Sequence, residues 1–228
     1  MFTLDQIVPW GRSYHEYAAM FSLSENDILR RILGVGDGPA SFNAEATRRG
    51  TSVVSCDPIY AFSRADLESR IATTYAQVID QARQNQDEFI WNSIPSVEDL
   101  GNIRMAAMQE FLKDYPTGVA EGRYLKAQLP SLPFPAHAFD LALCSHLLFL
   151  YSQQLNGEFH RASLLELCRV AREVRVFPLL TFGGVRSPHL EECLAVVQAA
   201  GHRVSMKRVG YEFQRGACEM LRIQAKRG

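Results

Sequence analysis

The segment from residue 30 to residue 57 constrains the fold most, because a glycine-rich turn stands there between two short apolar runs. Residues 30–34 lack the alternation of a half-exposed strand and indicate a strand buried on both faces. After the turn, residues 39–49 begin with proline and are followed by Gly50, which predicts a helix. Residues 52–56 are rich in β-branched side chains and predict a second strand. Strand, turn, helix and strand together form one right-handed βαβ unit.

The rest of the chain extends this unit. Further strands are predicted over residues 123–128, 139–144, 173–177, 202–209 and 217–225, and further helices over residues 13–22, 160–171 and 188–200. Only a short turn region separates the last two strands, so they could pair antiparallel at the edge of the sheet. The sequence therefore predicts an α/β, Rossmann-like fold. Its sheet would be mostly parallel and seven-stranded, with an antiparallel edge strand, in one domain over residues 1–228.

Residues 60–122 interrupt this alternation. They predict helices over residues 64–85, 96–101 and 103–114, with breaks at Pro95 and Pro116. A direct crossover between parallel strands needs far fewer residues. We therefore expect a helical insertion at 60–122 that caps the ligand edge of the sheet and whose aromatic side chains shape a pocket for a small acceptor. A structural cover or the surface of a homodimer is the alternative.

Composition and charge exclude several classes of protein. The chain has 24 basic and 25 acidic side chains, so it has no excess of positive charge with which to hold nucleic acid. Its longest apolar stretches are under ten residues, too short to cross a membrane, and the N-terminus lacks the pattern of a secretion signal. The five cysteines form no CxxC pair, which indicates reduced core thiols of a cytoplasmic protein and no metal site.

The glycine turn is also the candidate ligand site. Glycines let the backbone approach a ligand closely, and the following helix offers free N–H groups to an anion. Asp57 ends the second strand, 23 residues after Gly34, where a carboxylate can accept hydrogen bonds from both hydroxyls of a ribose. Pro39 stands where the dinucleotide fingerprint has its third glycine, which favours a nucleoside with a compact charged tail. The alternative is that the glycines only close a tight turn.

Three segments resemble the class I S-adenosylmethionine-dependent methyltransferases. They are ILGVGDGPASF at 32–42, VVSCDP at 53–58 and LPSLPFPAHAFDLALCSHLLFLY at 129–151. Within that family the chain is most similar to the broad small-molecule group, of the methyltransferase-11 type. The resemblance implies methyl transfer from S-adenosylmethionine to a small-molecule acceptor.

The resemblance also implies which residues contact the cofactor. The glycine turn would pass under its methionine part, Asp57 would hold the ribose, and the segment before the fourth strand would meet the adenine. The implied cofactor contacts are Gly34, Val35, Gly36, Gly38, Asp57, Pro58, Gln128, Leu129, Cys144 and Ser145.

The sequence departs from the family at two positions. Ile32 replaces an acid that often helps to bind the methionine ammonium group, and Gln128 replaces an acid on the adenine side. Asp37 could partly take over the role of the first acid, or could cap the following helix instead.

His146 is the candidate catalytic base, because it follows the fourth strand at the edge where such sheets bind ligands. The alternative is that it caps a turn or stacks on the cofactor. Trp10, Tyr14 and Tyr17 near the N-terminus could close over the cofactor or acceptor, or could simply pack. His160 is interpreted as a surface or capping residue at the start of a helix.

Two functions from different classes follow. The first is a small-molecule methyltransferase. The second is a protein that binds S-adenosylmethionine without catalysis, as a sensor or a partner subunit, and the loss of an acid at Ile32 favours it. A nicotinamide oxidoreductase is disfavoured by Pro39 and by the absence of a Tyr-xxx-Lys pair.

Overall fold

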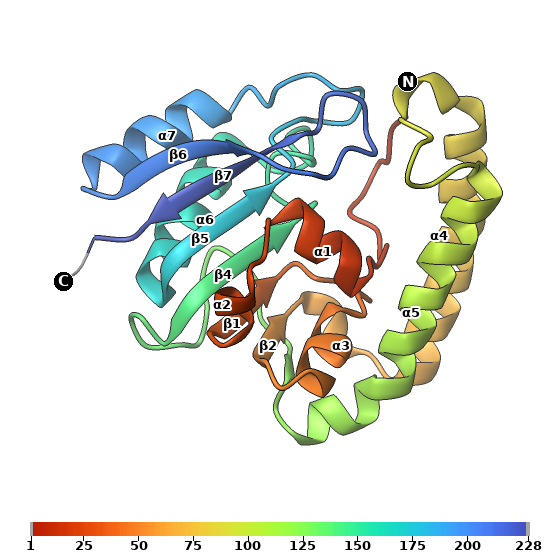
Figure 1. The fold of residues 1–228 in the computed structure, drawn as a ribbon, viewed down its shortest axis with the longest axis horizontal. Helices are drawn as coiled ribbons and strands as arrows, with labels where there is room; N and C mark the ends of the chain where they lie inside the picture. Colours follow the sequence, from red (N-terminus) through yellow and green to blue (C-terminus); the bar gives the residue numbers. More distant parts are fainter. Residues whose placement is uncertain (1, 227–228) are drawn as a thin grey trace.

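The structure, a computed structural model, describes residues 2–226 and has one twisted sheet with helices on both faces (Figure 1). The strands are β1 (Arg31–Val35), β2 (Ser52–Cys56), β3 (Tyr124–Leu125), β4 (Phe139–Ser145), β5 (Ala171–Phe177), β6 (Arg203–Arg208) and β7 (Glu219–Gln224).

The strand order across the sheet is β3-β2-β1-β4-β5-β7-β6. Strands β1 to β5 pair in parallel, and β7 pairs antiparallel with both β5 and β6. The predicted mostly parallel seven-stranded sheet is therefore confirmed. Its antiparallel strand, β7, lies beside the edge strand β6.

Seven α-helices are present within the described residues. They are α1 (Tyr14–Met20), α2 (Glu25–Ile28), α3 (Phe42–Arg48), α4 (Arg64–Gln84), α5 (Val97–Ala120), α6 (Gly157–Val170) and α7 (Leu190–Ala199), with short 3-10 helices at Pro58–Ala61 (η1) and Gln86–Glu88 (η2). Serines at residues 13, 24, 63 and 96 accept a hydrogen bond from the first turn of α1, α2, α4 and α5, which fixes where these helices begin.

The two faces of the sheet bury different side chains of the same strand. In β1, Ile32 packs in the cluster that contains residues of α1 and α3, whereas Leu33 and Val35 pack in the cluster that contains residues of α6 and α7. Because both faces are covered, every one of these positions is apolar, and this explains why β1 shows no apolar–polar alternation.

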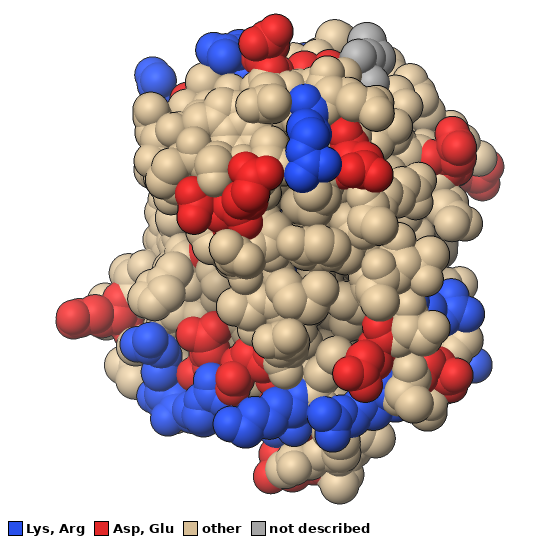
Figure 2. Space-filling view, turned by 90° about the vertical axis from the view of Figure 1, so that its right-hand side faces the viewer, with Lys and Arg blue, Asp and Glu red and all other residues tan. Residues whose placement is uncertain are grey.

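Helices α4 and α5 form a long pair between β2 and β3 in the chain, and they stand along one side of the molecule in Figure 1. A third apolar cluster, which includes Leu67, Phe111 and Tyr124, joins them to the sheet edge at β3. Figure 2 faces this side and shows a largely uncharged middle with a band of basic side chains across its lower end. Within residues 2–226, no helix is both long and apolar enough to span a membrane.

The separate helices expected over residues 96–101 and 103–114 are wrong, because one helix, α5, covers both ranges and continues through Pro116, where a break was expected. Proline removes one backbone donor there, but the helix is held by its packing. Phe111 is wholly buried, and the Tyr115 hydroxyl donates to the carbonyls of Tyr60 and Phe62. Tertiary contacts thus outweigh the local preference of proline.

The buried Arg175 of β5 has the partners that a charge inside an apolar strand requires. Its guanidinium bonds to Glu173 at 2.8 Å and to both carboxylate oxygens of Asp27 at 3.0 and 3.1 Å. It also donates to the carbonyl of Phe21 at 2.8 Å. This network ties the segment before β1 to the middle of the sheet.

The loop between β4 and α6 is fixed from behind by His160. His146 and Phe149 both have positive φ, of 54° and 68°, a region that side chains other than glycine rarely adopt. The Phe149 N–H donates to Nε2 of His160 at 3.1 Å, and Nδ1 of His160 pairs with the carbonyl of Asn156 at 2.8 Å. His160 is wholly buried, so its interpretation as a surface residue is wrong.

We expect His160→Leu to lower the free energy of unfolding by about 1–3 kcal/mol, because the buried N–H of Phe149 loses its acceptor. His160→Gln is the matched control, since its Oε1 can accept from the same N–H, and it should retain most of that stability. Urea unfolding of the three proteins measures the difference. Equal losses in both variants would contradict the role of the hydrogen bond.

The same histidine should make stability depend on pH. Burial holds the pKa of His160 below its usual value, and the neighbouring His189 adds to this effect. The unfolded chain therefore binds more protons than the folded chain below about pH 6.5, so stability falls as the pH drops. Between pH 7 and pH 5 the wild type should lose more stability than His160→Gln in urea unfolding, and parallel losses would count against this assignment.

Candidate functional site

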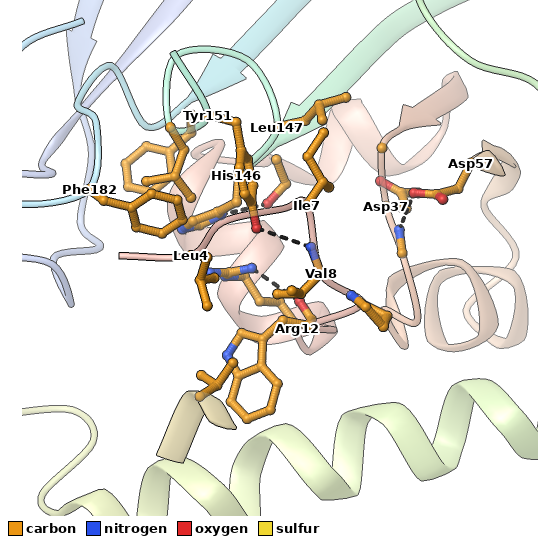
Figure 3. Close-up of a pocket in the computed structure, with 18 of the residues that line it drawn as sticks. Leu4, Ile7, Val8, Arg12, Asp37, Asp57, His146, Leu147, Tyr151 and Phe182 are labelled. Carbon is orange, nitrogen blue, oxygen red and sulfur yellow. Dashed lines mark hydrogen bonds between the residues drawn. The ribbon is translucent and has the colours of Figure 1, made fainter. Parts of the chain in front are cut away.

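A cavity of about 380 Å³ lies at the carboxyl ends of β1, β2 and β4. Residues of the glycine turn line one side of it, and residues after β4 and β5 line the other. Figure 3 shows Asp37 and Asp57 on one side and Tyr151 and Phe182 on the other, with the segment from Leu4 to Arg12 between them. The cavity is therefore where a parallel sheet of this kind binds ligands.

Asp57 joins the glycine turn to the end of β2. Its Oδ2 accepts from the Gly38 N–H at 2.9 Å (Figure 3). Its Oδ1 accepts from the Ile59 N–H at 2.9 Å. Burial raises the pKa of Asp57, and these two hydrogen bonds oppose the rise. Each oxygen retains a second lone pair, so the carboxylate can still accept hydrogen bonds from a ligand.

The glycines of the turn are needed for different reasons. A Cβ at Gly34 would overlap the Asp37 carboxylate, and a Cβ at Gly36 would lie 2.6 Å from Cδ2 of Leu147. Gly38 has φ of +56° and nothing within 4 Å of the place where a Cβ would stand. Gly34 and Gly36 thus allow the protein to pack on itself, and Gly38 is the glycine beside open space.

Asp37 folds back beneath the turn. The Tyr17 hydroxyl donates to its Oδ1 at 2.9 Å, and the Ser55 hydroxyl donates to its Oδ2 at 2.6 Å. Burial raises the pKa of Asp37 to about 6, although these two hydrogen bonds oppose the rise, and the charge of Asp57 adds to it. Helix α3 receives no side-chain cap at its N-terminus, so Asp37 does not cap it.

His146 lies at the centre of the cavity lining (Figure 3). Its Nδ1 is 2.9 Å from Oγ of Ser145. Burial and Asp37 hold the pKa of Tyr17 well above its usual range. Burial, together with Arg12 and Arg104, holds the pKa of His146 well below its usual range. His146 is thus a neutral imidazole at neutral pH.

Two guanidinium groups also line the cavity. Arg104 pairs with the Glu16 carboxylate, which also accepts from the Tyr211 hydroxyl at 3.0 Å. Arg12 donates through Nη1 to the carbonyl of Trp10 at 3.2 Å, but its Nε is buried without a hydrogen-bond partner. Burial and the charge of Arg104 lower the pKa of Arg12. Two positive charges and one negative charge therefore leave a net positive centre in this part of the cavity.

The N-terminal segment 2–12 crosses the cavity and is held there by side chains. Glu88 accepts from the Phe2 N–H at 3.0 Å, Gln154 donates to the carbonyl of Leu4 at 2.6 Å, and the Val8 N–H donates to the Tyr151 hydroxyl at 3.4 Å. At its end, the Ser41 N–H donates to the carbonyl of Arg12 at 3.0 Å. Residues that are far apart in the sequence thus hold the segment 2–12 over the cavity.

Most residues expected at a cofactor site line this cavity. Those that do are Val35, Gly36, Gly38, Asp57, Pro58, Gln128, Leu129, Ser145 and His146. Gly34 and Cys144 do not line it: the space beside Gly34 is filled by Asp37, and the Cys144 side chain is wholly buried within the sheet. Of the insertion aromatics Tyr75, Phe89, Trp91, Phe111 and Tyr115, Phe89 alone lines the cavity.

Several lining residues carried no signal in the sequence. Arg104 lies inside a helix of ordinary composition, and Tyr211 and Phe213 lie in a loop between two strands. Arg12 sits beside the aromatics of the N-terminal segment, which was the one available hint. All five cysteines are free, and no group of His, Cys, Asp and Glu side chains within residues 2–226 is placed to hold a metal ion.

Similar folds occur among solved methyltransferases. The magnesium protoporphyrin IX methyltransferase ChlM of Synechocystis PCC 6803, solved with bound SAH, superposes with a TM-score of 0.52 at 12% identity, over 93% of this chain and 84% of that one. The mitomycin 7-O-methyltransferase MmcR gives a TM-score of 0.51 at 12% identity, over 93% of this chain and 54% of that one. The seven-stranded sheet of this chain is thus the fold of S-adenosylmethionine-dependent methyltransferases.

No protein-family model matches the sequence. The uncharacterized protein MJ0045 of Methanocaldococcus jannaschii is 30% identical over 222 residues, which cover 97% of both chains. At this identity and coverage, the chain belongs to the same family as MJ0045.

Proposed function

We propose that the protein is an S-adenosylmethionine-dependent methyltransferase that acts on a small molecule. The observation that carries this proposal is the bond between Gly38 and Asp57, which joins the glycine turn to the acid at the end of β2 inside the cavity. In a sheet of methyltransferase order, this pairing supports binding of a nucleoside whose ribose meets the acid. Gln128 and Leu129, after β3, would then flank the base.

Arg12 supports the presence of an amino-acid tail on that nucleoside. Its Nε is buried without a partner, and a buried guanidinium without a counter-charge is costly. A carboxylate can bond to Nε and Nη2 together, side by side. Arg12 would therefore bind the methionine carboxylate of the cofactor.

When bound, the cofactor supplies a methyl group on a sulfonium, so the protein has mainly to align the acceptor and exclude water. His146 would accept the proton of an acceptor hydroxyl or ammonium group. The Nδ1 of His146 would donate to Oγ of Ser145, which leaves Nε2 free to accept.

The size of the cavity and the free cysteines support the remaining parts of the proposal. A cavity of about 380 Å³ beneath the segment 2–12 suits a small-molecule acceptor better than a macromolecule. Five unpaired cysteines are typical of a reducing compartment such as the cytoplasm. The alternative of a non-catalytic binding protein rested on Ile32, whose side chain is wholly buried and does not line the cavity.

We expect Asp57→Ala to weaken the binding of S-adenosylhomocysteine at least about a hundredfold, because two charge-assisted hydrogen bonds of roughly 1.5–3 kcal/mol each are lost. Isothermal titration calorimetry measures the affinity. The control is Asp66→Ala, a change to an exposed acid in the first turn of α4 that should leave the affinity unchanged. Equal affinity of the wild type and Asp57→Ala would contradict the proposed site.

Methyl transfer itself is tested with a cofactor that carries a trideuterated methyl group. The wild type is incubated with this cofactor and a small-molecule extract of its source cells, and mass spectrometry searches for products that carry the label. Labelled products with the wild type and none with Asp57→Ala are expected. Binding of S-adenosylhomocysteine without any labelled product would favour the non-catalytic alternative.

Ser145→Ala should change the tautomer of His146, because Nδ1 of the ring loses the hydroxyl oxygen to which it would donate. Nitrogen chemical shifts of the ring, measured by NMR at neutral pH, distinguish the two tautomers. We expect Nε2 of His146 to be unprotonated in the wild type and partly protonated in Ser145→Ala. Tyr14→Phe is the control, since Tyr14 packs on Phe42 outside the cavity. Identical shifts in the wild type and Ser145→Ala would contradict the proposed tautomer.

A further inference from the structure

The half of the cavity far from the glycine turn has a wall of four phenylalanines. Phe2 comes from the N-terminal segment, Phe89 from the connection of α4 to α5, Phe182 from the loop after β5, and Phe213 from the loop between β6 and β7. Ring centroids are 4.8 Å apart for Phe89 and Phe213, 5.6 Å for Phe2 and Phe182, and 5.8 Å for Phe2 and Phe89. We name these four residues the phenylalanine wall.

The sheet topology separates this wall from the proposed cofactor site. Gly38 and Asp57 follow β1 and β2, whereas Phe182 and Phe213 adjoin β5, β6 and β7. Strand β4 lies between these two groups of strands, and His146 follows it directly. In Figure 3, Phe182 and Asp57 accordingly lie on opposite sides of His146.

Backbone hydrogen bonds hold the wall together before any ligand arrives. The Ile90 N–H donates to the carbonyl of Phe213 at 2.7 Å, and the Arg215 N–H donates to the carbonyl of Glu88 at 2.8 Å. The Gln214 side chain donates to the carbonyl of Thr181 at 2.7 Å. Three loops from distant parts of the sequence are thus fixed against one another, which lowers the entropy that a ligand must overcome.

The two carboxylates near the wall, Glu16 and Glu88, already accept hydrogen bonds. Arg104 pairs with Glu16, which also accepts from the Tyr211 hydroxyl. The Glu88 carboxylate accepts from the Phe2 N–H at 3.0 and 3.1 Å. The four rings offer no hydrogen-bond donor or acceptor, so a charged ligand group placed among them would lose its water without replacement. The wall therefore selects by apolar contact and by the stacking of rings.

We propose that the phenylalanine wall binds the methyl acceptor through an uncharged aromatic ring system. The inference rests on the proposed function, because it takes the wall as the acceptor end of a cavity whose other end holds the cofactor. The ring system would lie among Phe2, Phe89, Phe182 and Phe213. Its nucleophilic group would then point back toward His146.

The test uses two dyes that share one ring system. N-phenyl-1-naphthylamine is uncharged, and 8-anilino-1-naphthalenesulfonate is the same skeleton with a sulfonate. Each dye is titrated, with fluorescence as the readout, into the full chain saturated with S-adenosylhomocysteine. We expect saturable one-to-one binding of the neutral dye, and at least tenfold weaker binding of the sulfonate.

Phe182→Ala and Phe213→Ala should each weaken the binding of the neutral dye about tenfold or more. The affinity for S-adenosylhomocysteine, measured by calorimetry, should stay unchanged. Phe182→Ala should affect the stability of the fold less than Phe213→Ala, because Phe182 is only partly buried. Phe62→Ala is the matched control, since this partly buried phenylalanine lies outside the cavity, beneath Arg70. The control should bind both ligands as the wild type does.

Dye binding that is insensitive to Phe182→Ala and Phe213→Ala, tighter binding of the sulfonate, or failure of the neutral dye to bind the chain saturated with S-adenosylhomocysteine would each overturn the inference. These outcomes leave the proposed function standing, because the affinity for S-adenosylhomocysteine is measured separately. Failure of the wild type to bind S-adenosylhomocysteine would instead contradict the proposed function, and with it the assignment of the wall to an acceptor.

Discussion

The buried carboxylate of Asp37 is the group on which the geometry of the cavity depends. It occupies the space beside Gly34, and it accepts hydrogen bonds from Tyr17 of α1 and Ser55 of β2. One carboxylate thus joins the glycine turn to a helix that precedes it and to a strand that follows it. A carboxylate at such depth is tolerated because both of its oxygens are satisfied.

The consequences of this arrangement reach both ends of the turn. With the turn held from below, the Gly38 N–H meets Asp57, and the open space beside Gly38 faces away from protein atoms. His146 is held separately, by the contact of its Nδ1 with Oγ of Ser145. The proposed ribose acceptor is therefore fixed by a connected set of buried hydrogen bonds, which is how a site gains precise geometry.

The cavity is closed by parts of the chain that lie outside the sheet. The segment 2–12 crosses it, and the connection of the long helices α4 and α5 brings Phe89 to the loop that holds Phe213. The insertion thus shapes the cavity through a few residues near its turn and along α4 and α5, while most of its aromatics form a separate core with β3. A long pair of packed helices can hold Phe89 in place, because the packing of the helices fixes the position of the loop that connects them.

Local patterns in the sequence determined the sheet, the glycine turn and the acid at Asp57. Apolar runs, glycines and helix caps act over a few neighbouring residues, so the strands of the βαβ unit could be placed to within a residue. Local patterns gave the wrong prediction at Pro116, because the packing of Phe111 and Tyr115 stabilises α5 beyond that residue. They also gave the wrong prediction at His160, because its place in a helix does not indicate that its side chain accepts a hydrogen bond from the Phe149 N–H.

The tertiary structure alone decided which distant side chains meet. Arg12 and Arg104 share a cavity although 92 residues separate them in the sequence, and Phe2 contacts Phe182 across the whole fold. Such meetings depend on strand order and on the path of the insertion, which no local pattern encodes. The sequence by itself therefore determined the fold and the end of the cavity that holds the glycine turn and Asp57. Only the folded chain brought together the Asp37 carboxylate with Tyr17 and Ser55, the net positive centre at Arg12 and the phenylalanine wall.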